Sequence, residues 1–186
     1  MNRERIVIIG ASLAGATAAA TLREEGFDGA IDLIGAEAQP PYNRPPLSKE
    51  YLRGQARFEE QLVKPVDYYA EQRITLRLGV RASAVDSKRK LVELEGGEQI
   101  AYDRLLVATG GRNRPLAGPG AALEGLFQLR TVEDCDRLLE MINTMLYISQ
   151  TEAAAEKPPR STTRTKTSIS PDRLMSIRAI VISIHK

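Results

Sequence analysis

The sequence predicts an α/β domain built around a parallel β-sheet, and consecutive features near the start of the 186-residue chain support this prediction. A β-branched run, Ile6 to Ile9, closes at a glycine and has the composition of a buried parallel strand. The next segment, residues 14–25, is rich in strong helix formers and ends at Gly26. The apolar run "AIDLI" follows. A strand, a turn, a helix and a second strand within roughly thirty residues form a βαβ unit.

The composition is that of an ordinary globular protein, with 42% hydrophobic and 27% charged residues. A formal net charge of +2 gives no reason to expect nucleic acid as a partner. With one cysteine, Cys135, and one histidine, His185, we expect no internal disulfide, no metal site and no histidine-based catalytic triad. No apolar run is long enough to span a membrane and no signal-peptide core is recognisable, so we expect a cytoplasmic protein.

The turn after the first strand reads Gly10-Ala-Ser12-Leu-Ala-Gly15, a variant of the dinucleotide fingerprint G-x-G-x-x-G with serine at the second glycine. The first glycine of the fingerprint permits a tight turn, and the third permits close packing of the helix. Serine is small, so a pyrophosphate can still sit at the helix N-terminus, where free N–H groups attract anions. Glu37 follows the second strand, is suited to binding ribose hydroxyls, and disfavours a 2′-phosphate. We therefore predict a bound dinucleotide rather than a purely structural turn.

Residues 40–46, Pro-Pro-Tyr-Asn-Arg-Pro-Pro, lead directly into Leu-Ser-Lys. Proline fixes φ and lacks a backbone donor, so we expect a loop and not the interior of a helix or of a central strand. This loop leaves the carboxyl end of the second strand, where open α/β sheets bind their ligands. We expect Arg44 and Lys49 to face a dinucleotide pyrophosphate or a reactive ring. The alternative is two solvated cations on a surface bend.

Three separated stretches, "VIIGASLAGATAAATLREEG", "IDLIGAEAQPPYNRPPLSKEYLRG" and "YDRLLVATGGRNRPL", together resemble the N-terminal FAD domain of the oxygenase-coupled ferredoxin reductases. This family includes reductases of the rhodocoxin, putidaredoxin and rubredoxin type and belongs to the larger glutathione-reductase-like flavoprotein group. The resemblance covers roughly residues 4–140, and its Arg-Pro-Pro-Leu-Ser-Lys string is much rarer than a glycine fingerprint. It implies a Rossmann-like fold with FAD as cofactor, NAD(P)H as electron donor and an iron-sulfur ferredoxin or rubredoxin as electron acceptor.

Residues 74–108 predict short strands. The stretches "ITLRLG", "RASAVD", "KLVELE" and "QIAYD" are rich in β-formers, and Gly96-Gly97 marks a hairpin turn before the last of them. We interpret this region as a small antiparallel meander inserted into the Rossmann-like domain. The stretch "RLLVATGG" then returns as a buried parallel strand. Its Ala-Thr-Gly-Gly ending, taken alone, is typical of a strand-to-loop turn.

The resemblance also implies which residues hold the cofactor. It places Lys49 near the isoalloxazine ring, where a cation can stabilise negative charge on the reduced ring, and makes it the one catalytic candidate. It places Ala82 against the adenine through the backbone, and Arg44 against the phosphates or the ribityl chain. The full set that it assigns to FAD is Gly10, Ser12, Ala14, Gly15, Glu37, Arg44, Lys49, Ala82, Ala108, Thr109, Gly110 and Arg130.

Cys135 lies in "TVEDCDRLLEMI", which predicts a helix opened by Thr131 with acidic residues in its first turn. Because acidic neighbours disfavour a thiolate, we expect no catalytic role for this cysteine. The resembled family needs no redox cysteine.

The amino-acid composition changes after residue 142, so we predict an FAD-binding domain over 1–142 and a divergent tail over 143–186. The last glycine is Gly125, and the tail holds 12 Ser and Thr among its 44 residues, with seven Lys and Arg against three Asp and Glu. This composition predicts a disordered basic tail. Its run "RAIVISI" is β-prone without a visible partner and is an aggregation hazard if exposed.

Members of the resembled family continue into an NAD-binding unit, a return segment that completes the FAD site, and an interface domain. We find none of these after residue 142, so we interpret the tail as the product of a truncated or frame-shifted reading frame; the alternative is a functional basic segment that docks an acidic partner. We expect this chain to have no intact NADH-dependent reductase activity. Three hypotheses stay open: a domain that still holds FAD weakly, a non-enzymatic remnant, and a binding module for NAD or ADP alone.

Overall fold

The computed structural model describes residues 4–119, 121, 126–155 and 181–183. The chain divides into two compact units, Met1–Arg112 and Asn113–Lys186. The first unit holds the predicted sheet and nucleotide turn, and the second holds the long helix that precedes the tail.

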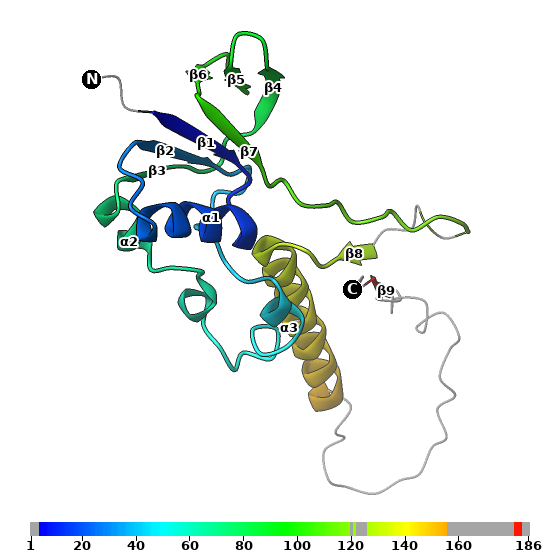
Figure 1. Ribbon diagram of the computed structural model, residues 1–186. Coiled ribbons are helices and arrows are strands. Elements are labelled where there is room, and N and C mark those ends of the chain that lie inside the picture. The colour runs from blue at the N-terminus through cyan, green and yellow to red at the C-terminus, as the bar shows by residue number, and fades with distance from the viewer. Residues whose placement is uncertain (1–3, 120, 122–125, 156–180, 184–186) are drawn as a thin grey trace, which may run out of the picture. The chain divides into compact units, whose positions relative to one another are not determined.

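The first unit is built on a four-stranded parallel sheet with the strand order β3-β2-β1-β7 (Figure 1). Its strands are β1 (Arg5–Ile9), β2 (Ala30–Ile34), β3 (Ile74–Arg77) and β7 (Arg104–Val107). Helix α1 (Leu13–Glu24) connects β1 to β2. The βαβ unit predicted from the sequence is therefore confirmed, with each boundary within one or two residues of the expected one.

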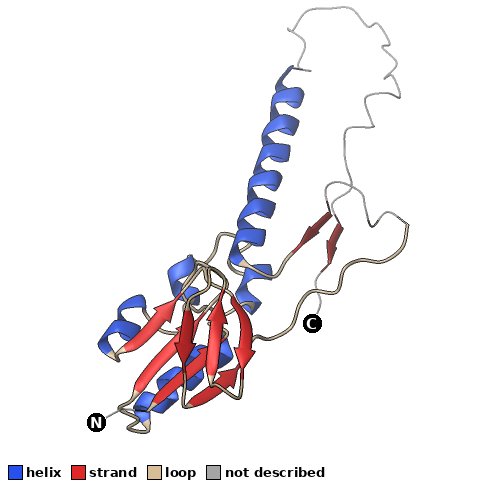
Figure 2. Ribbon diagram, turned by 90° about the horizontal axis from the view of Figure 1, so that it is seen from above, coloured by secondary structure: helices blue, strands red, loops and turns tan. Residues whose placement is uncertain are grey.

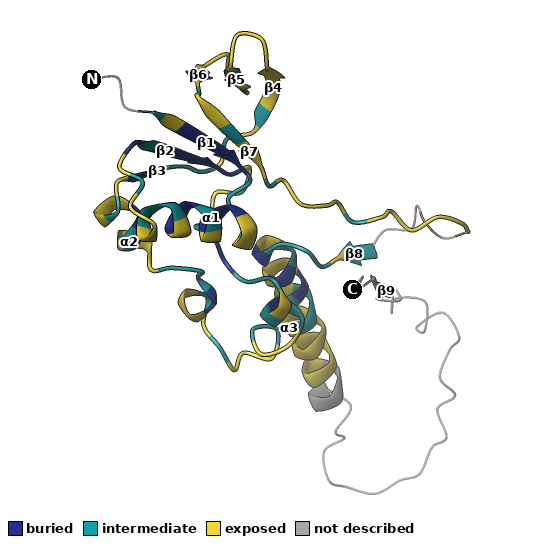
Figure 3. Cartoon of the chain, viewed as in Figure 1, coloured by how far each residue is buried: buried dark blue, intermediate teal, exposed yellow. Residues whose placement is uncertain are grey.

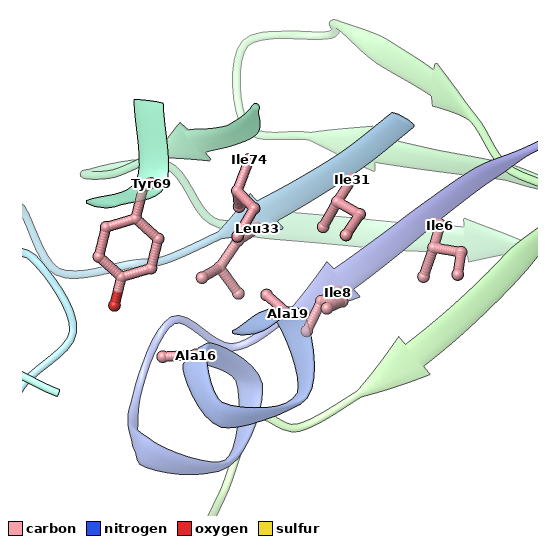
Figure 4. Packing of buried hydrophobic residues seen from close by; sticks show 8 residues of the cluster. All are labelled: Ile6, Ile8, Ala16, Ala19, Ile31, Leu33, Tyr69 and Ile74. Atoms are coloured by element: carbon pink, nitrogen blue, oxygen red, sulfur yellow. The ribbon is translucent and has the colours of Figure 1, made fainter. Parts of the chain in front are cut away.

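One face of the sheet packs against helices because alternate residues of each strand point to the same side. Ile6 and Ile8 of β1 face this side together with Ile31 and Leu33 of β2. The buried alanines Ala16, Ala19 and Ala20 on α1 let the helix approach the sheet closely, as the small-residue pattern predicted. The short helix α2 (Val66–Glu71), which the sequence analysis did not predict, adds the buried ring of Tyr69 to the same cluster (Figure 4).

The opposite face packs against an antiparallel meander, β4 (Ala82–Asp86), β5 (Leu91–Leu94) and β6 (Gln99–Ala101) (Figure 2). Val7, Ile9 and Ile34 of the parallel sheet form one apolar cluster with Val92, Leu94 and Ile100 of the meander. Gly96 and Gly97, both with positive φ, form the hairpin turn between β5 and β6, as predicted. The inserted meander is confirmed.

The first strand assigned to the meander was placed in the wrong sheet. Strand β3 pairs in parallel with β2, from Ile31–Ile74 to Ile34–Arg77 in register, and forms one edge of the parallel sheet. Its alternating pattern is that of any half-buried strand, and the pattern alone cannot distinguish parallel from antiparallel partners.

Strand β7 is parallel, as expected, but it is not buried. Leu106 and Val107 are 39% and 61% exposed, whereas β1 and β2 are almost wholly buried (Figure 3). Between α1 and β7 lies an open, largely apolar groove of about 960 Å³, lined by Leu13, Leu22 and Leu105 among others. We call this the α1–β7 groove. An apolar run in the sequence shows that a strand can be buried, but only neighbouring elements can bury it.

Arg23 fixes the carboxyl end of α1. Its guanidinium donates hydrogen bonds to three backbone carbonyls, those of Gln72, Phe27 and Arg73, at 2.7, 2.5 and 2.9 Å. These carbonyls belong to the turn after α1 and to the turn between α2 and β3. One side chain therefore ties α1 to the loop that begins the third strand.

The second unit contains β8 (Leu126–Gln128), α3 (Val132–Ala155) and β9 (Val181–Ser183). The side chains of Thr131 and Asp134 cap the helix reciprocally, because the Thr131 hydroxyl accepts the Asp134 N–H at 3.2 Å and the Asp134 carboxylate accepts the Thr131 N–H at 3.0 Å. Burial acts to raise the pKa of Asp134, but the hydrogen bonds from Thr131, Arg130 and Arg137 outweigh it and lower that pKa. The predicted helix start is confirmed.

Two expectations about the tail need correction within the described residues. Helix α3 does not end at residue 142 but continues to Ala155, and residues 152–155, Glu-Ala-Ala-Ala, are strong helix formers. Part of the β-prone run also has a partner, since β9 pairs in parallel with β8. The rest of the predicted disordered tail, residues 156–180 and 184–186, lies outside the described residues.

A buried carboxylate joins the two sheets of the first unit. Asp32 on β2 is only 4% exposed and accepts a hydrogen bond from Arg77 Nε on β3 at 2.9 Å. The same guanidinium donates through Nη1 to Glu98, in the β5–β6 hairpin, at 2.9 Å. Arg77 therefore bridges the parallel sheet and the meander, and its hydrogen bond with Asp32 raises the Arg77 pKa.

We expect Asp32→Ala to lower the free energy of unfolding by about 3 kcal/mol, because it removes the buried partner of Arg77 and leaves that partly buried guanidinium paired only with the more exposed Glu98. The measurement is urea unfolding followed by circular dichroism. The control is Glu95→Ala, which removes a pair with Arg81 in which both side chains are more than half exposed, and which we expect to cost less than about 1 kcal/mol. Equal losses in the two variants would contradict the prediction.

Candidate functional site

Three neighbouring strands of the parallel sheet end beside the predicted site residues. Gly10 follows β1, the segment leading to Glu37 follows β2, and Ala108 follows β7. Because the strands are parallel, their carboxyl ends share one edge of the sheet. The fold thus brings together segments that lie nearly a hundred residues apart in the sequence.

The glycines of the turn are required by backbone packing. A Cβ on Gly10, whose φ is +118°, would lie 2.2 Å from the Ala108 carbonyl oxygen. A Cβ on Gly15 would lie 1.9 Å from the Gly10 carbonyl oxygen and 3.2 Å from Ile8 Cγ2. The Ala108 N–H also donates to the Ile9 carbonyl at 2.7 Å. The first and third fingerprint glycines therefore have the roles that the sequence pattern predicts.

The N-terminus of α1 faces away from the core. Ser12 caps the helix with extended backbone, and its side chain makes no capping hydrogen bond in the structure. Leu13 and Ala14 are exposed, whereas Gly15 and Ala16 are buried. The first N–H groups of a helix have no partner within the helix, and the helix dipole is positive at this end. The turn thus presents accessible donors and a small cap residue, which suits a pyrophosphate.

Glu37 and Arg44 lie together at the end of β2. The guanidinium of Arg44 is hydrogen-bonded to Glu37 Oε1, and the two side chains are 26% and 30% exposed. The Tyr42 hydroxyl donates to the other carboxylate oxygen, Oε2, at 2.6 Å. Both oxygens of this carboxylate therefore have a partner of their own, and the cation expected to face the phosphates is paired with the carboxylate expected to bind the ribose.

The loop predicted at residues 40–46 and the residues that follow it are not wholly irregular. Pro45–Ser48 form a 3₁₀ turn, η1, in which the prolines occupy the first positions, where a missing N–H is tolerated. The expectation of a loop was therefore too strict. The exposed Lys49 follows this turn, with its N–H donating to the Pro46 carbonyl at 2.9 Å.

The remaining predicted residues lie on three further segments. Thr109 and Gly110 follow Ala108 and are exposed. Ala82 begins β4, and the chain just before it runs along the end of β2, since the Gly79 N–H donates to the Glu37 carbonyl at 2.8 Å. Arg130 belongs to the second unit, where its backbone N–H donates to the Asp134 carboxylate at 3.1 Å.

Tyr42 is the residue that sequence reasoning missed. It lies in the loop at residues 40–46, between Glu37 and Arg44 in the sequence. The feature that could have identified it is a phenol in a polar loop, five residues after a predicted ribose-binding carboxylate. Spacing alone does not determine the partner of a tyrosine hydroxyl, which can pair with many different groups.

The thiol of Cys135 is buried in the second unit, and burial, reinforced by Asp136 and Asp134, raises its pKa to about 11. The expectation that its neighbours disfavour a thiolate is confirmed. Among the described residues, no cluster of three histidine, cysteine or acidic side chains could hold a metal ion. No helix in the same part of the chain is both long and apolar enough to cross a membrane.

Comparisons with known proteins identify the family of this chain. The family model "Pyridine nucleotide-disulphide oxidoreductase" matches residues 4–145, which is most of the chain. The chain belongs to this family. Members of the family bind FAD and use NAD(P)H, so the resemblance found in the sequence and the FAD-domain fold are confirmed.

The similar proteins include a rhodocoxin reductase and reductase components of dioxygenase systems. The chain is 45% identical over 133 residues to rhodocoxin reductase of Rhodococcus erythropolis, covering 72% of this chain and 31% of that protein. It is 44% identical over 134 residues to the ferredoxin–NAD(+) reductase component of the p-cumate 2,3-dioxygenase system of Pseudomonas putida, covering 72% and 33%.

Among solved structures, the covalent putidaredoxin reductase–putidaredoxin complex matches with a TM-score of 0.71 and 38% identity, covering 76% of this chain and 34% of that chain. The chain thus spans about a third of the length of these family members.

We expect Gly15→Ala to lower the free energy of unfolding by about 3 kcal/mol, because the new methyl group overlaps the Gly10 carbonyl. Thermal and urea unfolding measure the change. Gly111→Ala is the matched control, since a Cβ there meets no heavy atom within 4 Å, and we expect a change within about 0.5 kcal/mol. The packing argument fails if Gly15→Ala unfolds at the same urea concentration as Gly111→Ala.

We also expect the Cys135 thiol to react slowly with a water-soluble disulfide reagent. A pKa of about 11 in place of 9.0 leaves about a hundredfold less thiolate at pH 8, and burial restricts access further. Because the pKa is raised, the labelling rate should keep rising with pH beyond 9. The reference is the same chain unfolded in urea; equal rates for folded and unfolded protein would disprove this.

Proposed function

We propose that this chain is the FAD-binding portion of a cytoplasmic NAD(P)H-dependent reductase, which passes electrons through FAD to a ferredoxin or rubredoxin that feeds an oxygenase. The observation that carries the proposal is the meeting of the glycine turn, Glu37 and the Ala-Thr-Gly segment at one edge of the sheet. The names of the similar proteins, a rhodocoxin reductase and a dioxygenase ferredoxin reductase, support the choice of electron acceptor.

The residues present fit a flavin dinucleotide. The α1 N-terminus offers N–H donors to the pyrophosphate, and the cradle made by Gly10 and Gly15 has no room for a Cβ at either position. Glu37 lies at the end of β2 with a carboxylate that can accept ribose hydroxyls. Arg44 lies beside it, and the positive charge of its guanidinium can also attract the phosphates or bind the ribityl chain.

Bound FAD would supply hydride acceptance and single-electron transfer. In this proposal Lys49 provides a cation near the isoalloxazine ring and stabilises negative charge on it after reduction. The backbone of Ala108, Thr109 and Gly110 lets the ring approach closely, since Gly110 has a positive φ and no side chain. Ala82 and Arg130 complete the proposed set, at the adenine and at a further FAD contact.

We further propose that this chain alone does not oxidise NADH. A second dinucleotide site needs its own glycine-rich turn, and the sequence has no glycine after Gly125.

A second candidate function is dinucleotide binding without turnover. It is favoured by the exposure of β7 and of the α1–β7 groove, because a sheet with an exposed edge strand encloses a cofactor less completely.

The first test is the visible spectrum of the purified chain after incubation with excess FAD and desalting. We expect retained flavin absorbance, and we expect Glu37→Gln to weaken FAD binding about tenfold, because a charged acceptor for the ribose hydroxyls is lost. Glu93→Gln, on an exposed position of β5, is the control for a change of charge. A colourless wild-type protein would favour a non-enzymatic remnant.

The second test adds NADH to the flavin-loaded chain under anaerobic conditions. We expect the flavin absorbance to persist for minutes, whereas chemical reduction with dithionite should bleach it at once. Rapid bleaching by NADH would show that the chain carries a nicotinamide site and would overturn the proposal of inactivity.

A further inference from the structure

The carboxylate proposed to bind ribose is held by a residue to which no role has been assigned. Tyr42 is only 4% exposed, although it belongs to a surface loop between two strands. Its hydroxyl donates to Glu37 Oε2 at 2.6 Å, a distance typical of a strong hydrogen bond between a hydroxyl and an ionised carboxylate. The contact links residues five positions apart, so the loop folds back on the end of β2.

The ring of Tyr42 has little freedom to move. It packs edge-on against Phe58, with the ring centroids 5.4 Å apart and an angle of 63° between the planes. The backbone on both sides is paired with the segment around 61–63: the Asn43 N–H donates to the Gln61 carbonyl at 2.8 Å, and the Val63 N–H donates to the Pro41 carbonyl at 2.9 Å. The position of the hydroxyl is therefore set by two separate segments of the chain.

The same ring also supports the cation beside the carboxylate. The Arg44 guanidinium carbon lies 5.4 Å from the centroid of the Tyr42 ring, within the range of a cation–π contact, while the guanidinium is paired with Glu37 Oε1. Tyr42 thus touches both charged partners. Removing the hydroxyl alone would free one carboxylate oxygen without disturbing the ring, the stacking or the ion pair.

A carboxylate held in this way is already oriented to accept hydrogen bonds from two adjacent hydroxyl groups. Each oxygen can accept about two hydrogen bonds, so Oε1 and Oε2 each keep an acceptor position after Arg44 and Tyr42 are bound. The plane of the carboxylate is fixed before a ligand arrives, and less rotational freedom is lost when two adjacent hydroxyls bind. An anionic substituent on the ribose would meet the same carboxylate and be repelled.

We propose that Tyr42 is a positioning residue that orients the Glu37 carboxylate towards the free 2′- and 3′-hydroxyls of an adenosine ribose. This inference rests on the proposed function, since it assumes that Glu37 is the ribose acceptor. The ligand class is an adenosine dinucleotide with an unmodified ribose.

The test is a double-mutant cycle measured by equilibrium dialysis of FAD. The proteins are the wild type, Tyr42→Phe, Glu37→Gln and the double variant. We expect Tyr42→Phe to weaken FAD binding about fivefold to tenfold in the wild-type background, and less than about twofold when Glu37 is already Gln. Binding of FMN, which lacks the adenosine ribose, should be unchanged by Tyr42→Phe.

Two controls address folding. Tyr102→Phe removes a hydroxyl from a residue outside this loop and should bind FAD like the wild type. Circular dichroism checks that Tyr42→Phe is folded. If that variant unfolds, the cycle gives way to a direct comparison of Glu37→Asp with the wild type, because Asp keeps the charge but draws the carboxylate away from the tyrosine hydroxyl. We then expect a fivefold to tenfold loss of affinity for FAD and none for FMN, and a Glu37→Asp variant that binds FAD like the wild type would overturn the inference.

Each outcome decides a different claim. Equal losses in both backgrounds, or equal losses for FAD and FMN, would mean that Tyr42 only supports the loop, and the inference would be wrong while the proposed function stands. If the wild type binds no FAD, the proposed function fails. The cycle is then run with ADP-ribose, which carries the same adenosine, and absence of ADP-ribose binding would overturn the inference as well.

Discussion

The close approach of backbone to backbone at the end of β1 is the constraint on which the rest of the first unit depends. Gly15 packs on the Gly10 carbonyl, and Gly10 packs on the Ala108 carbonyl, with no space for a side chain at either glycine. These two contacts fix the start of α1 relative to both β1 and β7. The buried alanines of the helix, and the donors at its N-terminus, take their positions from this point.

Two carboxylates on and after β2 have different surroundings because they lie at different positions along the strand. Asp32, in the middle of the strand, is buried and paired with Arg77, so it joins the sheet to the meander. Glu37, just past the end of the strand, is 30% exposed and paired with Arg44 at the edge of the sheet proposed to bind the dinucleotide. Similar chemistry therefore stabilises the fold in one place and offers an accessible acceptor in the other.

The sequence was informative where local pattern alone determines structure. The βαβ unit, the glycine turn, the hairpin at Gly96-Gly97 and the capped start of α3 all follow from spacing and residue type within a few positions. What could not be predicted depends on distant partners: the sheet to which β3 belongs, the exposure of β7, the strand that pairs with β9, and the hydroxyl that meets Glu37. In each case the residue has several possible neighbours, and only the fold selects one.

The α1–β7 groove leaves apolar side chains of the first unit, such as Leu13 and Leu106, exposed to solvent. Within the part of the chain that the structure describes, β7 pairs with β1 on one side and with no strand on the other, and an open strand edge beside apolar surface is the kind of surface that other chains cover. Keeping such a surface in water costs free energy that burial would recover. The same short strand therefore serves two purposes: its carboxyl end borders the nucleotide turn, and its open edge is where the fold has the most apolar surface left to bury.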